Sequence, residues 1–165
     1  MRRNVLFKTL VDILYYLHFI GLLNVIIVLP FGVVFINQVD MNVMDWSLLY
    51  WLILIISLVS YIIFLRGLYY LRKMARFLLS NNYFSGEISS NLKKSGRHFV
   101  IAGIILFCLS TVIWINLLSG NQIKLIHDTN LLVPFFLMII GLFFIIQSDS
   151  LFLAKNIKEE NDLTV

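Results

Sequence analysis

Four polar side chains lie deep inside long apolar runs of this sequence, where a small ligand site or a polar constriction would need them. They are Asn24 in the first run, Ser57 in the second, and Ser110 with Thr111 in the third. An amide or hydroxyl group at that depth is costly in hydrocarbon and tends to face neighbouring helices. The alternative is that this polar layer only fixes helix register through hydrogen bonds, and we favour that interpretation.

Two charged residues at the edges of apolar runs form a second candidate site. Asp149 closes the fourth run and Arg66 closes the second at a comparable depth, so the sequence predicts an ion pair between them. A proton or cation relay that includes His18 is the alternative. We favour the ion pair, because a coupled transporter usually needs a carboxylate near the centre of a run and none is there.

Enzyme chemistry has little support in the sequence. The nucleophile elbow G-x-S-x-G, the phosphate loop, the zinc-hydrolase helix and paired catalytic carboxylates do not occur, and no recognised metal-ligand spacing is present. The single cysteine, Cys108, excludes an intrachain disulfide. We therefore expect no catalytic residues, no metal and no cofactor.

The composition indicates that lipid is the solvent for most of the chain. Of 165 residues 60% are hydrophobic and 13% are charged, and the mean hydropathy is +0.91, which excludes an ordinary soluble domain. Charges fall in blocks between uncharged runs long enough to cross a hydrocarbon core of roughly 30 Å. The predicted fold class is an all-α membrane protein, a four-transmembrane-helix bundle forming a single domain over 1–165, with spans at roughly 13–35, 46–65, 99–118 and 131–150.

The distribution of basic residues predicts the orientation. Of the 13 Lys and Arg residues, all but Lys124 fall on one side of the predicted bundle. The positive-inside rule places that side, with both termini, in the cytoplasm. The formal charge of +4 is then a topology signal, and we expect no direct binding of nucleic acid.

The segment 66–98 between the second and third spans is predicted to form a cytoplasmic helical hairpin. Apolar residues recur at helical spacing after the second span, and Ser85 is placed to cap a second helix that carries Glu87 in its first turn. The tail 154–165 is rich in charge, and Lys155 and Glu159 are spaced to pair on a short helix.

The hairpin and the tail together carry a candidate partner surface. The surface could dock an acidic protein segment or anionic lipid headgroups. Its basic residues could instead serve only as a topology signal. As a further alternative, the acidic residues of the tail could pack against the basic residues of the hairpin. The residues of this surface are Arg72, Lys73, Arg76, Lys93, Lys94, Glu159, Glu160 and Asp162.

The hairpin contains the motifs Leu71-Arg72-Lys73-Met74, Phe84-Ser85-Gly86-Glu87 and Leu92-Lys93-Lys94-Ser95-Gly96, and the chain ends on Glu159 to Val165. These segments resemble a bacterial four-span membrane family filed as domain of unknown function number 2975. Two positions depart from the pattern: Tyr83 stands where a proline is common, and Ser95 stands where an aliphatic residue usually precedes the glycine. The resemblance covers essentially the whole chain and implies a location in the bacterial inner membrane. Its members are often encoded beside a small helix-turn-helix regulator of the Cro type.

These observations favour a non-enzymatic regulatory or sensory subunit of the membrane. It would act through a cytosolic partner, for which a small helix-turn-helix regulator is the candidate that the resemblance implies. A small transporter or efflux component built around the polar layer is the first alternative, and an immunity-type membrane protein is the second. Besides membrane lipid, a second copy of the chain is a further candidate partner.

Overall fold

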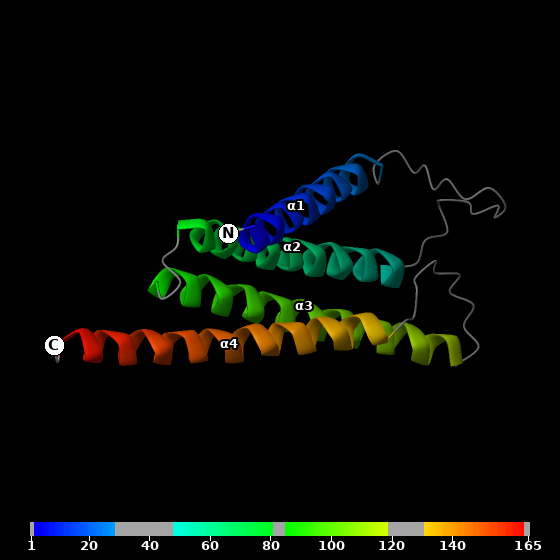
Figure 1. Ribbon diagram of the computed structural model, residues 1–165. Helices are drawn as coiled ribbons and strands as arrows, with labels where there is room; N and C mark the ends of the chain where they lie inside the picture. Colours follow the sequence, from blue (N-terminus) through cyan, green and yellow to red (C-terminus); the bar gives the residue numbers. More distant parts are fainter. Residues whose placement is uncertain (1, 29–47, 81–84, 119–130, 164–165) are drawn as a thin grey trace.

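The computed structural model describes residues 2–28, 48–80, 85–118 and 131–163, and these form four long helices (Figure 1). The helices are α1 (Arg2–Val28), α2 (Leu48–Phe77), α3 (Gly86–Leu118) and α4 (Leu132–Leu163), and the 3-10 turn η3 (Leu78–Ser80) follows α2. Each helix is long and apolar enough to cross a membrane, with mean hydropathy of 1.9 to 2.4 over its most apolar window. The chain is therefore a multi-pass, all-helical membrane protein, as the sequence predicts.

The helices extend further than the predicted spans at the end of the molecule where charges gather. Helix α1 begins at Arg2 rather than near residue 13, and α4 continues to Leu163 rather than ending near residue 150. Pairs of opposite charge four residues apart stabilise these extensions, because Lys8 contacts Asp12 and Lys155 contacts Glu159 on the helix surface. The uncharged runs of the sequence coincide with the apolar part of each helix. The predicted spans therefore leave out the charged turns at the helix ends.

Helix α3 occupies the centre of the bundle. It packs along α2 and along α4. Helix α1 crosses α2 at an angle and diverges from it toward Val28 (Figure 1). The start of α1, the end of α2, the start of α3 and the end of α4 share one end of the molecule. Helix α1 is the least buried of the four.

The contact between α3 and α4 is a small-residue seam in which the two backbones nearly touch. A Cβ atom on Gly141 would lie 2.7 Å from the carbonyl oxygen of Gly96 and 2.8 Å from the amide nitrogen of Val100. A Cβ on Gly103 would lie 3.0 Å from the carbonyl oxygen of Pro134. Small residues at interfaces let membrane helices approach this closely. The seam repeats every seven residues on both helices: Ser89, Gly96 and Gly103 on α3, and Pro134, Gly141 and Ser148 on α4.

Paired serines close this seam near the start of α3. Ser89 Oγ donates to the carbonyl oxygen of Ser148 (3.0 Å), and Ser148 Oγ donates back to the carbonyl oxygen of Ser89 (2.8 Å). Both side chains are buried. The reciprocal bonds fix the register between α3 and α4, because a shift by one residue would break both.

A second seam joins α2 to the neighbouring face of α3. Ser60 Oγ donates to the carbonyl oxygen of Ala102 (3.2 Å), and Ser95 Oγ donates to that of Gly67 (2.9 Å). The two pairs are again seven residues apart on each helix. Ser95 therefore has a structural role, since its buried hydroxyl links α3 to the backbone of α2.

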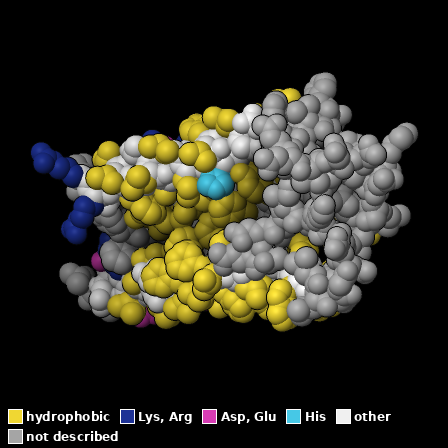
Figure 2. Space-filling view, turned by 90° about the vertical axis from the view of Figure 1, so that its right-hand side faces the viewer, with side chains coloured by type: hydrophobic (Ala, Val, Ile, Leu, Met, Phe, Trp, Pro, Cys, Tyr) yellow, Lys and Arg dark blue, Asp and Glu magenta, His cyan; other side chains and the backbone are white. Residues whose placement is uncertain are grey.

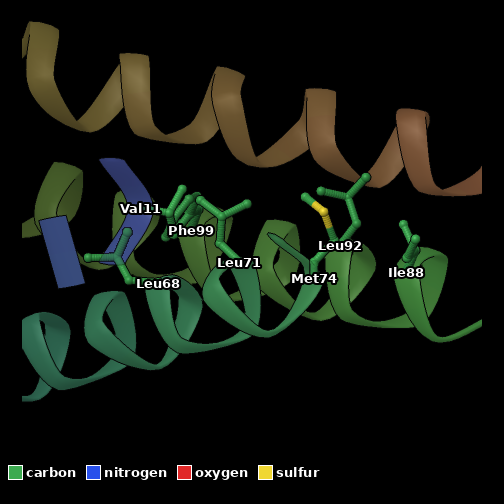
Figure 3. Packing of buried hydrophobic residues seen from close by; sticks show 7 residues of the cluster. All are labelled: Val11, Leu68, Leu71, Met74, Ile88, Leu92 and Phe99. Atoms are coloured by element: carbon green, nitrogen blue, oxygen red, sulfur yellow. The ribbon is translucent and has the colours of Figure 1, made fainter. Parts of the chain in front are cut away.

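The main apolar core lies where α2 ends and α3 begins (Figure 3). It joins residues of three helices, and Leu68, Ile88 and Leu92 are almost completely buried. The predicted hairpin segment 66–98 is thus the best-packed part of the described chain. The whole cluster consists of Val11, Leu68, Leu71, Met74, Ile88, Leu92 and Phe99.

We predict that Gly141→Ala destabilises the protein. Alanine in a helix interior is ordinarily more favourable than glycine by about 1 kcal/mol, but here its Cβ would meet backbone atoms of α3. Overpacking of this kind costs about 1–3 kcal/mol, so the thermal midpoint in detergent should fall. Gly86→Ala is the matched control, because its Cβ would meet only the flexible end of Lys155 at 3.4 Å. Equal midpoints for both variants would contradict the seam.

Candidate functional site at the charged end

Most charged side chains of the described chain gather at one end of an otherwise apolar surface (Figure 2). We call this the charged end: residues 2–12 of α1, 66–80 of α2 and η3, 86–98 of α3, and 149–163 of α4. It forms because the helices alternate in direction. The segments that carry charges in the sequence are thereby placed side by side.

Arg72 is the centre of a clamp between α2 and α1. Its Nε donates to Asp12 Oδ1 (2.6 Å) and its Nη2 to the hydroxyl of Tyr16, while the guanidinium lies over the rings of Tyr15 and Tyr16 at 5.1 and 4.5 Å. Lys8 Nζ reaches the other oxygen of Asp12 at 2.7 Å. The Arg72 and Asp12 side chains are only 14% and 15% exposed. Arg72, predicted as part of a partner surface, therefore contacts α1 instead.

Two further hydrogen bonds hold α1 against α2 and η3. The hydroxyl of Tyr61 donates to the carbonyl oxygen of His18 (2.9 Å), and Asn4 Nδ2 donates to that of Leu78 (3.3 Å). Gly21 permits the close approach at Tyr61, because a Cβ there would lie 3.2 Å from the hydroxyl oxygen. Polar contacts thus provide much of the attachment of a helix that buries little apolar surface.

Asp149 pairs with Lys93, whose Nζ lies 2.7 Å from Oδ1. The predicted partner, Arg66, is exposed on α2. The difference follows from the packing order, because α4 packs along α3 and the side chain nearest to Asp149 therefore comes from α3. Lys93 is thus engaged within the bundle, as Arg72 is.

The remaining residues of the predicted partner surface are exposed. They are Lys73, Arg76, Lys94, Glu159, Glu160 and Asp162. Glu159 pairs with Lys155 at 3.4 Å within α4, as the sequence predicts. Ser85 caps α3 as predicted, since its Oγ accepts from the amide of Ile88 (3.3 Å). Of the predicted partner surface, Arg72 and Lys93 therefore contact α1 and α4, and the other residues are exposed.

The four residues of the predicted polar layer lie on three helices and differ in exposure. Asn24 is exposed on α1, and Ser110 is buried on α3. Thr111 Oγ1 donates to the carbonyl oxygen of Phe107 on its own helix (2.8 Å). No hydrogen bond joins these four described side chains to one another. The serine hydroxyls that link helices belong instead to Ser60, Ser89, Ser95 and Ser148, and the seven-residue spacing of these contacts is the signal for them in the sequence.

Ser57 lines a groove among all four helices. The groove has a volume of about 490 Å³, and Figure 2 shows a hollow in the apolar face with a histidine at its edge. Its polar lining consists of His18, Ser57, Ser60 and Tyr61, and apolar side chains of α2, α3 and α4 complete it. Nδ1 of His18 donates to the carbonyl oxygen of Leu14 (2.8 Å), which fixes the ring on α1. Within the described ranges, no three His, Cys, Asp or Glu side chains are placed to hold a metal ion.

A family model described as "Protein of unknown function (DUF2975)" matches residues 34–165. The match includes α2, α3 and α4, with both seams and most of the charged end, and α1 lies outside it. Comparison with curated proteins and with solved structures gives no match.

We predict that Arg72→Gln lowers stability far more than Lys73→Gln. Both changes remove one positive charge from adjacent positions, but only Arg72 makes charged hydrogen bonds to α1. Losing such bonds costs about 1.5–3 kcal/mol, whereas an exposed lysine should change stability by no more than about 0.5 kcal/mol. Unfolding in mixed micelles measures both, and Asp12→Asn completes a double-mutant cycle. Equal effects of the two variants, or additive effects of Asp12→Asn and Arg72→Gln, would contradict the clamp.

Proposed function

The chain belongs to the DUF2975 family of proteins of unknown function, and we propose that it is a non-enzymatic regulatory or sensory subunit of the bacterial inner membrane. It acts through a soluble partner that docks at the charged end. The observation that carries this proposal is the continuation of α4 to Leu163, past the start of α3 (Figure 1).

The orientation supports a cytosolic partner. All but one of the 13 Lys and Arg residues lie on the side of the charged end, and the positive-inside rule assigns that side to the cytoplasm. Arg2 of α1 and Leu163 of α4 both lie at this end (Figure 1). In this orientation the hairpin 66–98 and the last turns of α4 are accessible from the cytosol.

The α4 extension, residues 150–163, combines apolar and acidic side chains on a helix that projects past the rest of the bundle (Figure 1). Ile157 is 59% exposed and Leu163 is 86% exposed, and Glu159, Glu160 and Asp162 lie between and beside them. The extension therefore offers apolar and acidic side chains side by side on one exposed helix. A helix can bind by lying in a groove on a partner protein.

A small helix-turn-helix regulator is the partner that we propose. The acidic residues of the α4 extension complement the basic surface that a DNA-binding protein carries. Holding such a protein at the membrane would keep it from DNA, and release would return it. The clamp at Arg72 offers the sensory element, because a change at α1 would reach the charged end through Asp12.

A small transporter is the second candidate, and the groove lined by Ser57 and His18 favours it. A ligand or substrate would then contact the groove, and the α4 extension would be dispensable. The two proposals therefore differ in which end of the molecule carries the function.

Copurification of the detergent-solubilised protein with a small helix-turn-helix regulator from its native cells tests the proposal. We expect the intact chain and Ser57→Leu to retain the regulator, and a chain truncated after Ala154 to lose it. Glu159→Gln/Glu160→Gln/Asp162→Asn should retain the helix and weaken binding at least tenfold. Equal retention by the truncated and intact chains, or retention by neither, would contradict the proposal. A transport defect of Ser57→Leu with an intact α4 extension would favour the second candidate.

A further inference from the structure

Basic residues on one face of the α2–α3 pair have no acidic partner in the described part of the chain. On α2 these are Arg66 and Lys73, and on α3 they are Lys94 and Arg97, and all four are exposed. By contrast, Arg72 and Lys93 are held by carboxylates of α1 and α4. The acidic side chains of the bundle thus neutralise one side of the α2–α3 pair and leave the other positive.

The exposed cations surround an aromatic centre. Tyr70 of α2 lies 5.2 Å from the ring of His98 and 5.7 Å from Lys94 Nζ, measured to its ring centroid. Nδ1 of His98 donates to the carbonyl oxygen of Lys94 (2.7 Å). These contacts show that the faces of α2 and α3 that carry the cations coincide. We call this set the α2–α3 basic face: Arg66, Tyr70, Lys73, Lys94, Arg97 and His98.

Helical spacing gathers the α2–α3 basic face into one strip. Arg66, Tyr70 and Lys73 follow at intervals of four and three residues, and Lys94 and Arg97 are three apart. Residues at these intervals are neighbours on a helix surface. The strip therefore presents several N–H donors and positive charges on one side of the α2–α3 pair rather than around its circumference.

The face lies at the boundary between apolar and polar parts of the molecule. Residues 52–65 of α2 are uncharged and Arg66 follows them, while residues 99–115 of α3 are uncharged and His98 precedes them. Phosphate groups of a bilayer lie at that depth, and basic pockets between helices at that level bind anionic headgroups. Exposed aliphatic side chains continue the same strips into the apolar part: Val59, Ile62, Ile101 and Ile104.

We propose that the α2–α3 basic face binds the phosphodiester headgroup of an anionic glycerophospholipid, with the acyl chains lying along Val59, Ile62, Ile101 and Ile104. Arg66 and Lys94 contact the phosphate oxygens, and the Tyr70 and His98 rings form the floor. Arginine suits this task because its planar N–H groups match phosphate geometry. The site uses α2 and α3 and none of the α4 extension, so its test does not depend on the soluble partner of the proposed function.

Native mass spectrometry of the purified full chain tests the site, with phosphatidylglycerol and phosphatidylcholine of identical acyl chains as probes. We expect phosphatidylglycerol to bind roughly tenfold tighter or more, given the contribution of each basic residue near a membrane surface. Arg66→Gln/Lys94→Gln should lose most of this preference. Arg3→Gln/Arg76→Gln is the matched control, since it removes the same charge from exposed positions elsewhere at the charged end and should keep the preference.

Two outcomes would overturn the site: equal binding of both lipids by the intact chain, or equal loss of preference in the control. Photocrosslinking with a diazirine phosphatidylglycerol needs no variant and should label 59–73 and 94–104, and labelling confined to α1 or α4 would also overturn it. Glycerol phosphate distinguishes a lipid headgroup from free phosphate. It should fail to displace the lipid at millimolar concentration, and complete displacement would contradict the lipid as the occupant.

Discussion

The approach of the α3 and α4 backbones at Gly96 and Gly141 is the constraint on which the rest of the structure depends. Without a hydrophobic driving force between helices in lipid, association relies on close packing and hydrogen bonds, and only glycine leaves room for the carbonyl groups that meet here. The seven-residue repeat of small residues fixes the register, and that register places Lys93 beside Asp149. The second seam, which uses Ser95 and Ala102 of α3, positions α2 against α3 in the same way. The arrangement of the charged end is thus a consequence of contacts inside the bundle.

Helix α1 is attached to the bundle by contacts of a different kind from those of the two seams. It has little buried surface, and three polar links attach it: Asp12 to Arg72 and the carbonyl of His18 to Tyr61 on α2, and Asn4 to Leu78 on η3. The family match begins after α1 and includes the three helices joined by the two seams. The chain thus combines a tightly packed three-helix unit with a first helix that contributes less to the buried core.

Features set by neighbours in the chain could be predicted from the sequence, and features set by helix rotation could not. The four helices, the Ser85 cap and the Lys155–Glu159 pair each depend on residues within a few positions of one another. The partner of Asp149, the role of Arg72 and the grouping of the polar layer depend on which helices adjoin and on which faces they present. Hydropathy carries no information about rotation. The spacing of Ser89, Gly96 and Gly103 and of Pro134, Gly141 and Ser148 did carry it, and would have indicated the buried faces of α3 and α4.

Disulfide formation between cysteines at positions 89 and 148 in native membranes tests the seam register most directly. The background is Cys108→Ser, which removes the native thiol. The hydroxyl oxygens of Ser89 and Ser148 lie 3.1 Å apart, so Ser89→Cys/Ser148→Cys should crosslink rapidly under mild oxidation. Ser89→Cys/Ser150→Cys, in which the second position is exposed on α4, should not. Slow crosslinking of the first pair, or equal crosslinking of both, would show that α3 and α4 do not share this register and would contradict the arrangement of the charged end.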